Sequence, residues 1–162
     1  MEKKILNLLN IQIQKEFESA YLYFALESYF DSIGLYGFAN WYKIQAQEEE
    51  YHAYKIYNFL IESNQHVELY QINKPEKKIE SIEEALNMAL RHEQYITKLI
   101  HNIYEEADNI SDYCTLNFLD WFIDEQMEEE KNAQRMIDHF TLFGNSSEGL
   151  YLLDKEFAKR KH

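Results

Sequence analysis

The sequence has 162 residues, enough for one domain with a sizeable core, and it contains only four glycines and one proline. So few chain-breaking residues exclude folds that turn often, such as β-sandwiches and propellers, and a hydrophobic content of 46% excludes intrinsic disorder. The net charge of −13 makes nucleic acids and anionic membrane surfaces poor partners, and it favours cations as partners.

The sequence carries no signal for export or for membrane insertion. No apolar run approaches the roughly 18–20 residues that cross a bilayer, and residues 1–4 lead into no signal-peptide core. The single cysteine, Cys114, forms neither an intramolecular disulfide nor a cysteine-based metal site. We therefore expect a cytoplasmic protein without a membrane partner.

Four long stretches have apolar residues at spacings of three and four, which is typical of amphipathic helices. We expect helices at about residues 4–32, 37–64, 81–108 and 112–143, and a short fifth helix at about 147–157. Ser81 starts an S-x-x-E capping box, in which its hydroxyl caps the third helix and Glu84 reaches back. Strand-like alternation is sustained nowhere, so the predicted fold is all-α.

The lengths of the connections predict the topology. A few residues around Gly34 join the first two helices, and a few around Asn109 join the third and fourth, so each pair is antiparallel. Residues 65–80 join the second and third helices, and fully extended they span about 50 Å, more than the about 40 Å of such a helix. We therefore expect one domain over residues 1–162, an up-down-down-up four-helix bundle with one long crossover.

Each apolar stripe is interrupted by a glutamate at a position that should be buried, and one of these is followed a turn later by a histidine. The residues are Glu16, Glu49 with His52, Glu93 and Glu129. Each glutamate lies about halfway along its helix, so the four should meet in one layer. Burying an ionised carboxylate is costly and neighbouring carboxylates raise each other's pKa values, so this layer requires a cation.

The residue types in this layer favour iron or manganese. Oxygen ligands with one nitrogen suit these metals, and a bridging glutamate suits a pair of ions. A lone glutamate on an apolar stripe is more often an edge residue whose carboxylate reaches water, and we assign that role to Glu27. The remaining histidines lie off the stripes, and we expect them at the surface: His66, His92, His101 and His139.

Four segments of the sequence resemble the bacterial non-haem ferritin family in order and spacing. They are QKEF (14–17), AQEEEYH (46–52), HEQ (92–94) and EQMEEEK (125–131), and LYLLDKE (150–156) resembles that family's short fifth helix. The resemblance covers nearly the whole chain. It implies a ferritin-like bundle, a ferroxidase that oxidises Fe²⁺ with O₂ or H₂O₂, and a homo-oligomeric shell of roughly 24 subunits that stores ferric oxide mineral.

The resemblance also implies a di-iron centre with assigned ligands. Glu16, Glu49 and His52 would hold the first iron, on one side of the layer. Glu49, Glu93 and Glu129 would hold the second iron, so that Glu49 bridges the pair. These assignments come from the family, whereas the layer itself follows from the position of the glutamates on their stripes.

Further residues receive roles from the same resemblance. Gln126 would lie beside the iron pair and hydrogen-bond to it or to bound oxygen, and Tyr23 and Trp121 would be aromatic side chains close to it. A third iron site on the cavity side would be formed by Glu48, Glu125 and Glu128. With these residues the predicted metal-binding set is complete.

Two departures from the pattern separate this chain from neighbouring families. Bacterioferritins and rubrerythrins carry a second Glu-x-x-His on the fourth helix, where this chain has Gln126-x-x-Glu129. Bacterioferritins bind haem through a methionine two residues before the histidine of the first motif. Glu50 stands at that position here, so we expect no haem.

Two other functions remain as alternatives to iron storage. A di-iron carboxylate oxidase or peroxidase acting on a small substrate would use the same layer, although it would need neither the third site nor the fifth helix. A non-catalytic helical interaction module would leave four buried glutamates without a counter-ion. The size of the particle separates these alternatives, because a storage shell is far larger than a monomer or a dimer.

Overall fold

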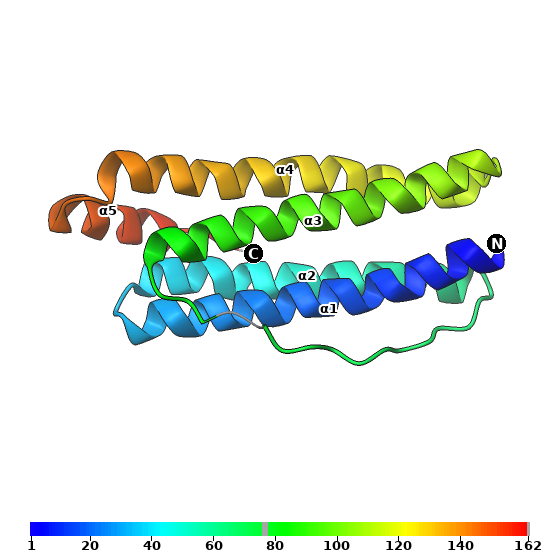
Figure 1. Ribbon diagram of the computed structural model, residues 1–162, viewed down its shortest axis with the longest axis horizontal. Coiled ribbons are helices and arrows are strands. Elements are labelled where there is room, and N and C mark those ends of the chain that lie inside the picture. The colour runs from blue at the N-terminus through cyan, green and yellow to red at the C-terminus, as the bar shows by residue number, and fades with distance from the viewer. Residues whose placement is uncertain (76–77, 162) are drawn as a thin grey trace.

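The computed structural model describes residues 1–75 and 78–161, and this part of the chain forms five α-helices. They are α1 (Lys3–Ser32), α2 (Tyr36–Glu62), α3 (Ile82–Asn109), α4 (Tyr113–Phe143) and α5 (Ser147–Phe157). Helices α1 to α4 lie side by side as a bundle, and α5 packs at one end of it (Figure 1). The predicted all-α bundle with a short fifth helix is confirmed.

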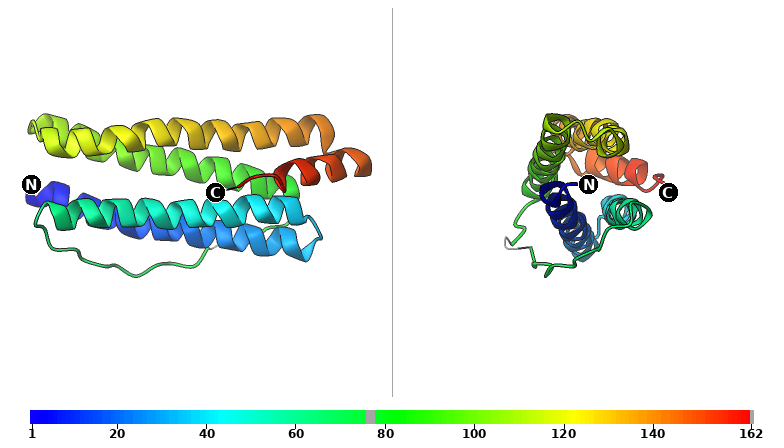
Figure 2. Two further views of the ribbon diagram at one scale, coloured as in Figure 1. Left: turned by 180° about the vertical axis from the view of Figure 1, so that it is seen from behind. Right: turned by 90° about the vertical axis from the view of Figure 1, so that its right-hand side faces the viewer.

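The connections have the predicted topology. Helices α1 and α2 form one antiparallel pair and α3 and α4 form another, as Figure 2 shows from behind and from one end. The long connection between the pairs runs along the bundle, so α2 and α3 are parallel. Residues 76 and 77 of the expected crossover at 65–80 lie outside the described part of the chain. Among the described residues, no helix has both the length and the apolar character needed to cross a bilayer.

Helix ends follow the capping signals in the sequence. The Ser81 hydroxyl accepts a hydrogen bond from the Glu84 amide at 3.1 Å, as the capping box predicts. The Glu84 carboxylate reaches back one residue further than expected, to the amide of Glu80 at 3.0 Å. Gly34, in the turn between α1 and α2, has φ +79°, a conformation that glycine adopts without strain.

Buried apolar residues form two clusters, one on each side of the mid-height layer. The α5-end cluster includes Leu26, Phe30, Phe38, Leu86, Met136 and Phe157. The opposite-end cluster includes Leu9, Ile13, Leu60, Ile100, Leu119 and Phe122. All four long helices contribute to both clusters, and on each helix the predicted ligands lie between its two apolar segments: Glu16, Glu49 with His52, Glu93 and Glu129. The clusters therefore fix the height at which the polar residues meet.

Candidate metal centre

The structure places the five predicted ligands of the layer in the interior of the bundle. Glu16 comes from α1, Glu49 and His52 from α2, Glu93 from α3 and Glu129 from α4, and each of them is at most 4% exposed. Because the apolar clusters pack the helices above and below, each side chain can turn only toward the bundle axis. Four carboxyl groups and an imidazole thus share a volume that water barely reaches.

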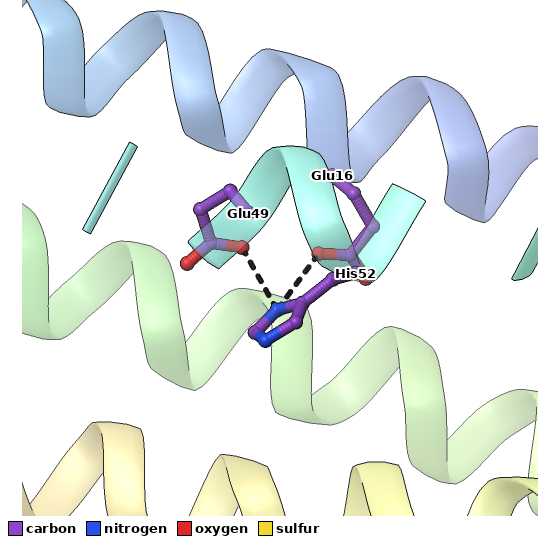
Figure 3. A group of neighbouring side chains, drawn as sticks. All are labelled: Glu16, Glu49 and His52. Carbon is purple, nitrogen blue, oxygen red and sulfur yellow. Dashed lines mark ion pairs between the residues drawn. The ribbon is translucent and has the colours of Figure 1, made fainter. Parts of the chain in front are cut away.

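Glu16, Glu49 and His52 face one another across α1 and α2 (Figure 3). His52 Nδ1 lies 3.3 Å from Glu49 Oε2 and 3.9 Å from Glu16 Oε2, and one ligand atom from each of the three residues lies within 4.8 Å of the others. Glu16 Oε2 is the one fully buried side-chain oxygen or nitrogen, among the described residues, without a hydrogen-bond partner. A buried carboxylate oxygen left unpaired is costly, and a cation would satisfy it, so the residues fit a metal ion here.

A second group of potential ligands lies on the other side of the imidazole. His52, Glu125 and Glu129 also have ligand atoms within 4.8 Å of one another, and His52 Nε2 lies 3.8 Å from Glu125 Oε1. Glu93 belongs to neither group in the described part of the chain. Its carboxylate instead accepts hydrogen bonds from the Tyr23 hydroxyl and, at 3.1 Å, from Gln126 Nε2.

Two glutamines for which the sequence had predicted no role donate hydrogen bonds to the carboxylates of Glu16, Glu49 and Glu129. Gln12 donates to Glu16 Oε1 at 2.7 Å, and Gln45 donates to Glu129 Oε2 at 2.7 Å and to Glu49 Oε1 at 3.3 Å. Both are nearly fully buried and precede a glutamate by four residues on the same stripe, a spacing that could have revealed them. Amides are neutral donors, so they orient the carboxylates without cancelling their charge.

Burial raises the pKa of the carboxyl groups of Glu16, Glu49 and Glu129 well above the usual range. Their mutual repulsion adds to this effect, since the charge of Glu93 raises the pKa of Glu49 and of Glu129. Burial also raises the pKa of Glu93, although Tyr23 and Gln126 act in the opposite sense. In the absence of a metal, burial therefore favours the protonated forms of these groups, and a cation that binds competes with protons for them.

The aromatic residues named by the resemblance lie beside the layer. Burial and the charge of Glu93 raise the pKa of the Tyr23 hydroxyl well above its usual range, so it remains a donor. The Trp121 ring meets the His52 ring edge-on, with centroids 5.4 Å apart, and Lys55 Nζ lies 4.2 Å from the Trp121 centroid. Trp121 thus packs against the imidazole of the layer.

The expectation that His92 lies at the surface is wrong. Its ring is partly buried between α1 and α3, where Nε2 lies 2.7 Å from the Ser19 hydroxyl, and burial lowers its pKa to about 4. The residue lies off the stripe, but α3 packs against α1 closely enough to cover it. His66 and His101 are exposed, His139 is partly buried, and Glu27 is a partly exposed edge residue.

The three residues of the expected third site do not share one position. Among the described residues they form no group with ligand atoms within 4.8 Å of one another. Glu48 is paired with Arg160 from the tail that follows α5, Glu125 faces His52, and Glu128 is exposed. All three nevertheless lie next to the layer, on α2 and α4.

Comparison with known proteins gives one consistent answer. A family model described as a ferritin-like domain matches residues 6–143. The bacterial non-heme ferritin of Staphylococcus haemolyticus is 38% identical over 160 residues, covering 99% of this chain and 96% of the relative. The corresponding protein of Staphylococcus epidermidis is 39% identical over the same share of both chains. A closed form engineered from the Archaeoglobus fulgidus ferritin has a TM-score of 0.96 at 41% identity and covers 99% of this chain and 98% of that chain.

Proposed function

Because the chain belongs to the ferritin-like domain family, we propose that it stores iron, oxidising Fe²⁺ to Fe³⁺ at the mid-height layer and keeping the product as ferric oxide inside a shell of many copies. The observation that carries this proposal is the buried group of Glu16, Glu49 and His52, with its unpartnered carboxylate oxygen. Iron is the substrate and the stored cargo, and the named relatives are bacterial non-heme ferritins.

The layer offers positions for two Fe²⁺ ions. We assign the first ion to Glu16, Glu49 and His52, whose ligand atoms already lie close together. We assign the second ion to Glu49, Glu93 and Glu129, so that Glu49 bridges the two. The mutual effect of these carboxyl groups on their pKa values supports the second assignment, because it requires them to be near neighbours.

The charge of the layer favours oxidation of the bound substrate. Carboxylate oxygens are hard anionic ligands, and they stabilise Fe³⁺ more than Fe²⁺. Each Fe²⁺ loses one electron, and the acceptor is O₂ or H₂O₂. Protons compete with the metal for these carboxyl groups, whose pKa values are raised, so uptake weakens as the pH falls.

Gln126 and Tyr23 act by orienting Glu93. Both donate to its carboxylate, and Gln126 Nε2 also lies 3.3 Å from the Thr97 hydroxyl, which fixes the amide between α3 and α4. Gln126 stands where related di-iron proteins have a charged ligand. A neutral amide there leaves the second position with weaker binding, which suits an ion that must be released.

The third site, at Glu48, Glu125 and Glu128, is part of the proposal as a weaker outer position. Glu125 is 27% exposed in its side chain and Glu48 26%, so both are wetter than the ligands of the layer. This outer site lies beside the layer and can receive iron that leaves the layer.

The proposed shell has about 24 copies of the 19.6-kDa chain, roughly 470 kDa in total. Each copy carries a net charge of −13, so the assembly attracts cations strongly. The alternative of an oxidase or peroxidase acting on a small substrate is not favoured, because the named relatives are ferritins.

Aerobic addition of Fe²⁺ to the metal-free protein tests the proposed function. We expect rapid oxidation of the first two ions per chain, a gel-filtration volume that corresponds to a shell, and electron-dense particles after loading with many ions per chain. A monomer or a dimer that oxidises Fe²⁺ no faster than buffer, and that forms no mineral core, would contradict it.

A further inference from the structure

The tail after α5 is fixed against the first half of α2. The Asp154 carboxylate of α5 accepts hydrogen bonds from the amides of Gly37 and Phe38, at 2.7 and 3.1 Å, and so caps the start of α2. A Cβ at Gly37 would lie 1.7 Å from the Asp154 carbonyl oxygen, so the close approach of the two helices requires glycine. Phe157 packs edge-on against Phe38, with ring centroids 4.7 Å apart. The chain therefore leaves α5 at a defined place beside α2.

From that place Arg160 reaches along α2 toward the metal centre. Its guanidinium lies 4.3 Å from the centroid of the Trp41 ring and donates to the Trp41 carbonyl oxygen at 3.3 Å. It also donates to Gln45 Oε1 at 2.8 Å and, through Nη2, to Glu48 Oε2. The side chain is only 14% exposed, and the Asn40 amide holds its backbone carbonyl at 3.2 Å. Arg160 is therefore a placed cation and not a freely moving surface charge.

The partner that matters here is Glu48. It belongs to the proposed outer site with Glu125 and Glu128, which lie one turn apart on α4. The charge of Glu48 helps to raise the pKa of Glu125, so the two carboxyl groups interact across the space between α2 and α4. The guanidinium already pairs with Glu48, and Glu48 does not join its expected partners around one position.

We propose that Arg160 competes with the metal ion of the outer site for Glu48, and that it weakens binding at that site without weakening the buried layer. An ion bound by all three glutamates must take the Glu48 carboxylate from the guanidinium, or share it with a second positive charge nearby. Arg160 thus limits how long iron stays at the outer site on its way to the mineral. The inference rests on the proposed function, since it assigns a role to a residue beside the same centre.

Arg160 could instead act only through Gln45, which it holds by the side-chain oxygen while the Gln45 amide donates to Glu49 and Glu129. The two roles predict opposite changes in metal affinity when Arg160 is replaced. Loss of a positioning contact would weaken binding at the layer, whereas loss of a competitor tightens binding at the outer site.

Calorimetric titration of the assembled, metal-free protein with Zn²⁺, which is redox-inert, separates these roles. We expect Arg160→Gln to tighten the weaker outer Zn²⁺ about tenfold, as removal of one charge-assisted contact from its ligand implies. The two tighter ions should change by less than about twofold. Lys159→Gln is the matched control, because it removes the same charge from the same tail, while the Lys159 side chain is 73% exposed and its ion pair within the described residues is with Glu156.

Two further variants test the cause. Arg160→Lys keeps a positive charge beside Glu48, so the outer affinity should stay near that of wild type. In a Glu48→Gln background the shared carboxylate is gone, and Arg160→Gln should then leave the outer affinity unchanged. Thermal midpoints and gel-filtration volumes show whether each variant is folded and assembled.

An outer Zn²⁺ affinity that is unchanged or weaker in Arg160→Gln would overturn the inference, and so would a gain that persists in the Glu48→Gln background. If wild-type protein binds two tight Zn²⁺ ions per chain, such a result refutes the role of Arg160 alone. A wild-type protein that binds no Zn²⁺ at the buried layer would refute the proposed function and this inference together.

Discussion

The apolar clusters at the two ends of the bundle and the carboxylate layer between them are equally buried, yet they contribute to folding with opposite signs. Leu9, Leu26, Leu60 and Ile100 are fully buried, and each contributes about 1.5–3 kcal/mol by leaving water. Glu16 and Glu49 are as deeply buried, but the folded state raises their pKa values and leaves one oxygen unpaired. This bundle therefore folds around a layer that destabilises it until a cation binds.

The largest effect should come from removing the bridging carboxylate. Glu49→Ala or His52→Ala should abolish rapid aerobic oxidation of Fe²⁺, a loss of at least about 100-fold in initial rate, with assembly intact. Both side chains turn into the layer, away from every outer face. Stopped-flow absorbance measures the rate, and Glu62→Ala, an exposed glutamate on the same helix, should oxidise Fe²⁺ like wild type. Wild-type rates in either layer variant would refute the assignment.

A substitution in an apolar cluster, outside the carboxylate layer, should lower the stability of the protein without lowering its activity. Leu60→Ala removes a fully buried side chain from the opposite-end cluster, and it should cost about 2–5 kcal/mol of unfolding free energy. Because Leu60 lies two turns beyond His52 on α2, the initial oxidation rate per folded chain should stay within about twofold of wild type. Thermal denaturation measures the loss of stability, and the rate assay measures the oxidation of Fe²⁺. An equal loss of rate in this variant would mean that the layer depends on packing far from it.

The same comparison explains how far the sequence alone could go. The helices and their order were predictable because few residues break the apolar periodicity and because Ser81 and Gly34 mark helix ends. The height of the glutamates followed from their distance along each helix. The spacing of Gln45 from Glu49 is visible in the sequence, but its contacts with Glu129 and Arg160 were not predictable, since they depend on how the helices pack. The role of Arg160 was not predictable either, because it acts through a tail whose position depends on how α5 packs against α2.

A third prediction concerns pH and the metal-free protein. At pH 7, Glu49→Gln should unfold with a free energy about 1–3 kcal/mol above that of wild type, since it removes a carboxyl group whose raised pKa in the folded state makes folding less favourable. Burial raises the pKa of Glu49 in the folded state, so the native state binds more protons than the unfolded chain above about pH 4.3. Wild-type stability therefore falls as the pH rises through this range, and the difference between the proteins should shrink toward pH 4.5.

Chemical denaturation of metal-free protein at several pH values measures this difference, with Glu62→Gln as the exposed control. A constant difference between pH 4.5 and pH 7 would show that Glu49 has the same pKa in the folded and unfolded states, and it would contradict the prediction. A less stable Glu49→Gln variant at pH 7 would show that the glutamate contributes to folding even without a metal.

The smallest effect should come from the outer site. Glu128→Ala should keep fast oxidation of the first two Fe²⁺ ions per chain and should change the iron-to-oxygen stoichiometry and later turnover, because Glu128 is exposed and lies outside the layer. Oxygen-electrode titration at two and at many ions per chain tests it. If the variant equals wild type in both regimes, Glu48, Glu125 and Glu128 form only an acidic patch. If the variant no longer oxidises the first two ions rapidly, Glu128 belongs to the layer.

The central claim is that the mid-height layer is where the substrate iron binds, and anomalous diffraction at the iron edge from crystals soaked anaerobically in Fe²⁺ tests it most directly. We expect two iron positions per chain, enclosed by the side chains of the layer: Glu16, Glu49, His52, Glu93 and Glu129. We also expect the bridged pair to be lost in crystals of Glu49→Gln. Iron found only on the outer carboxylates, or an intact pair in that variant, would contradict it.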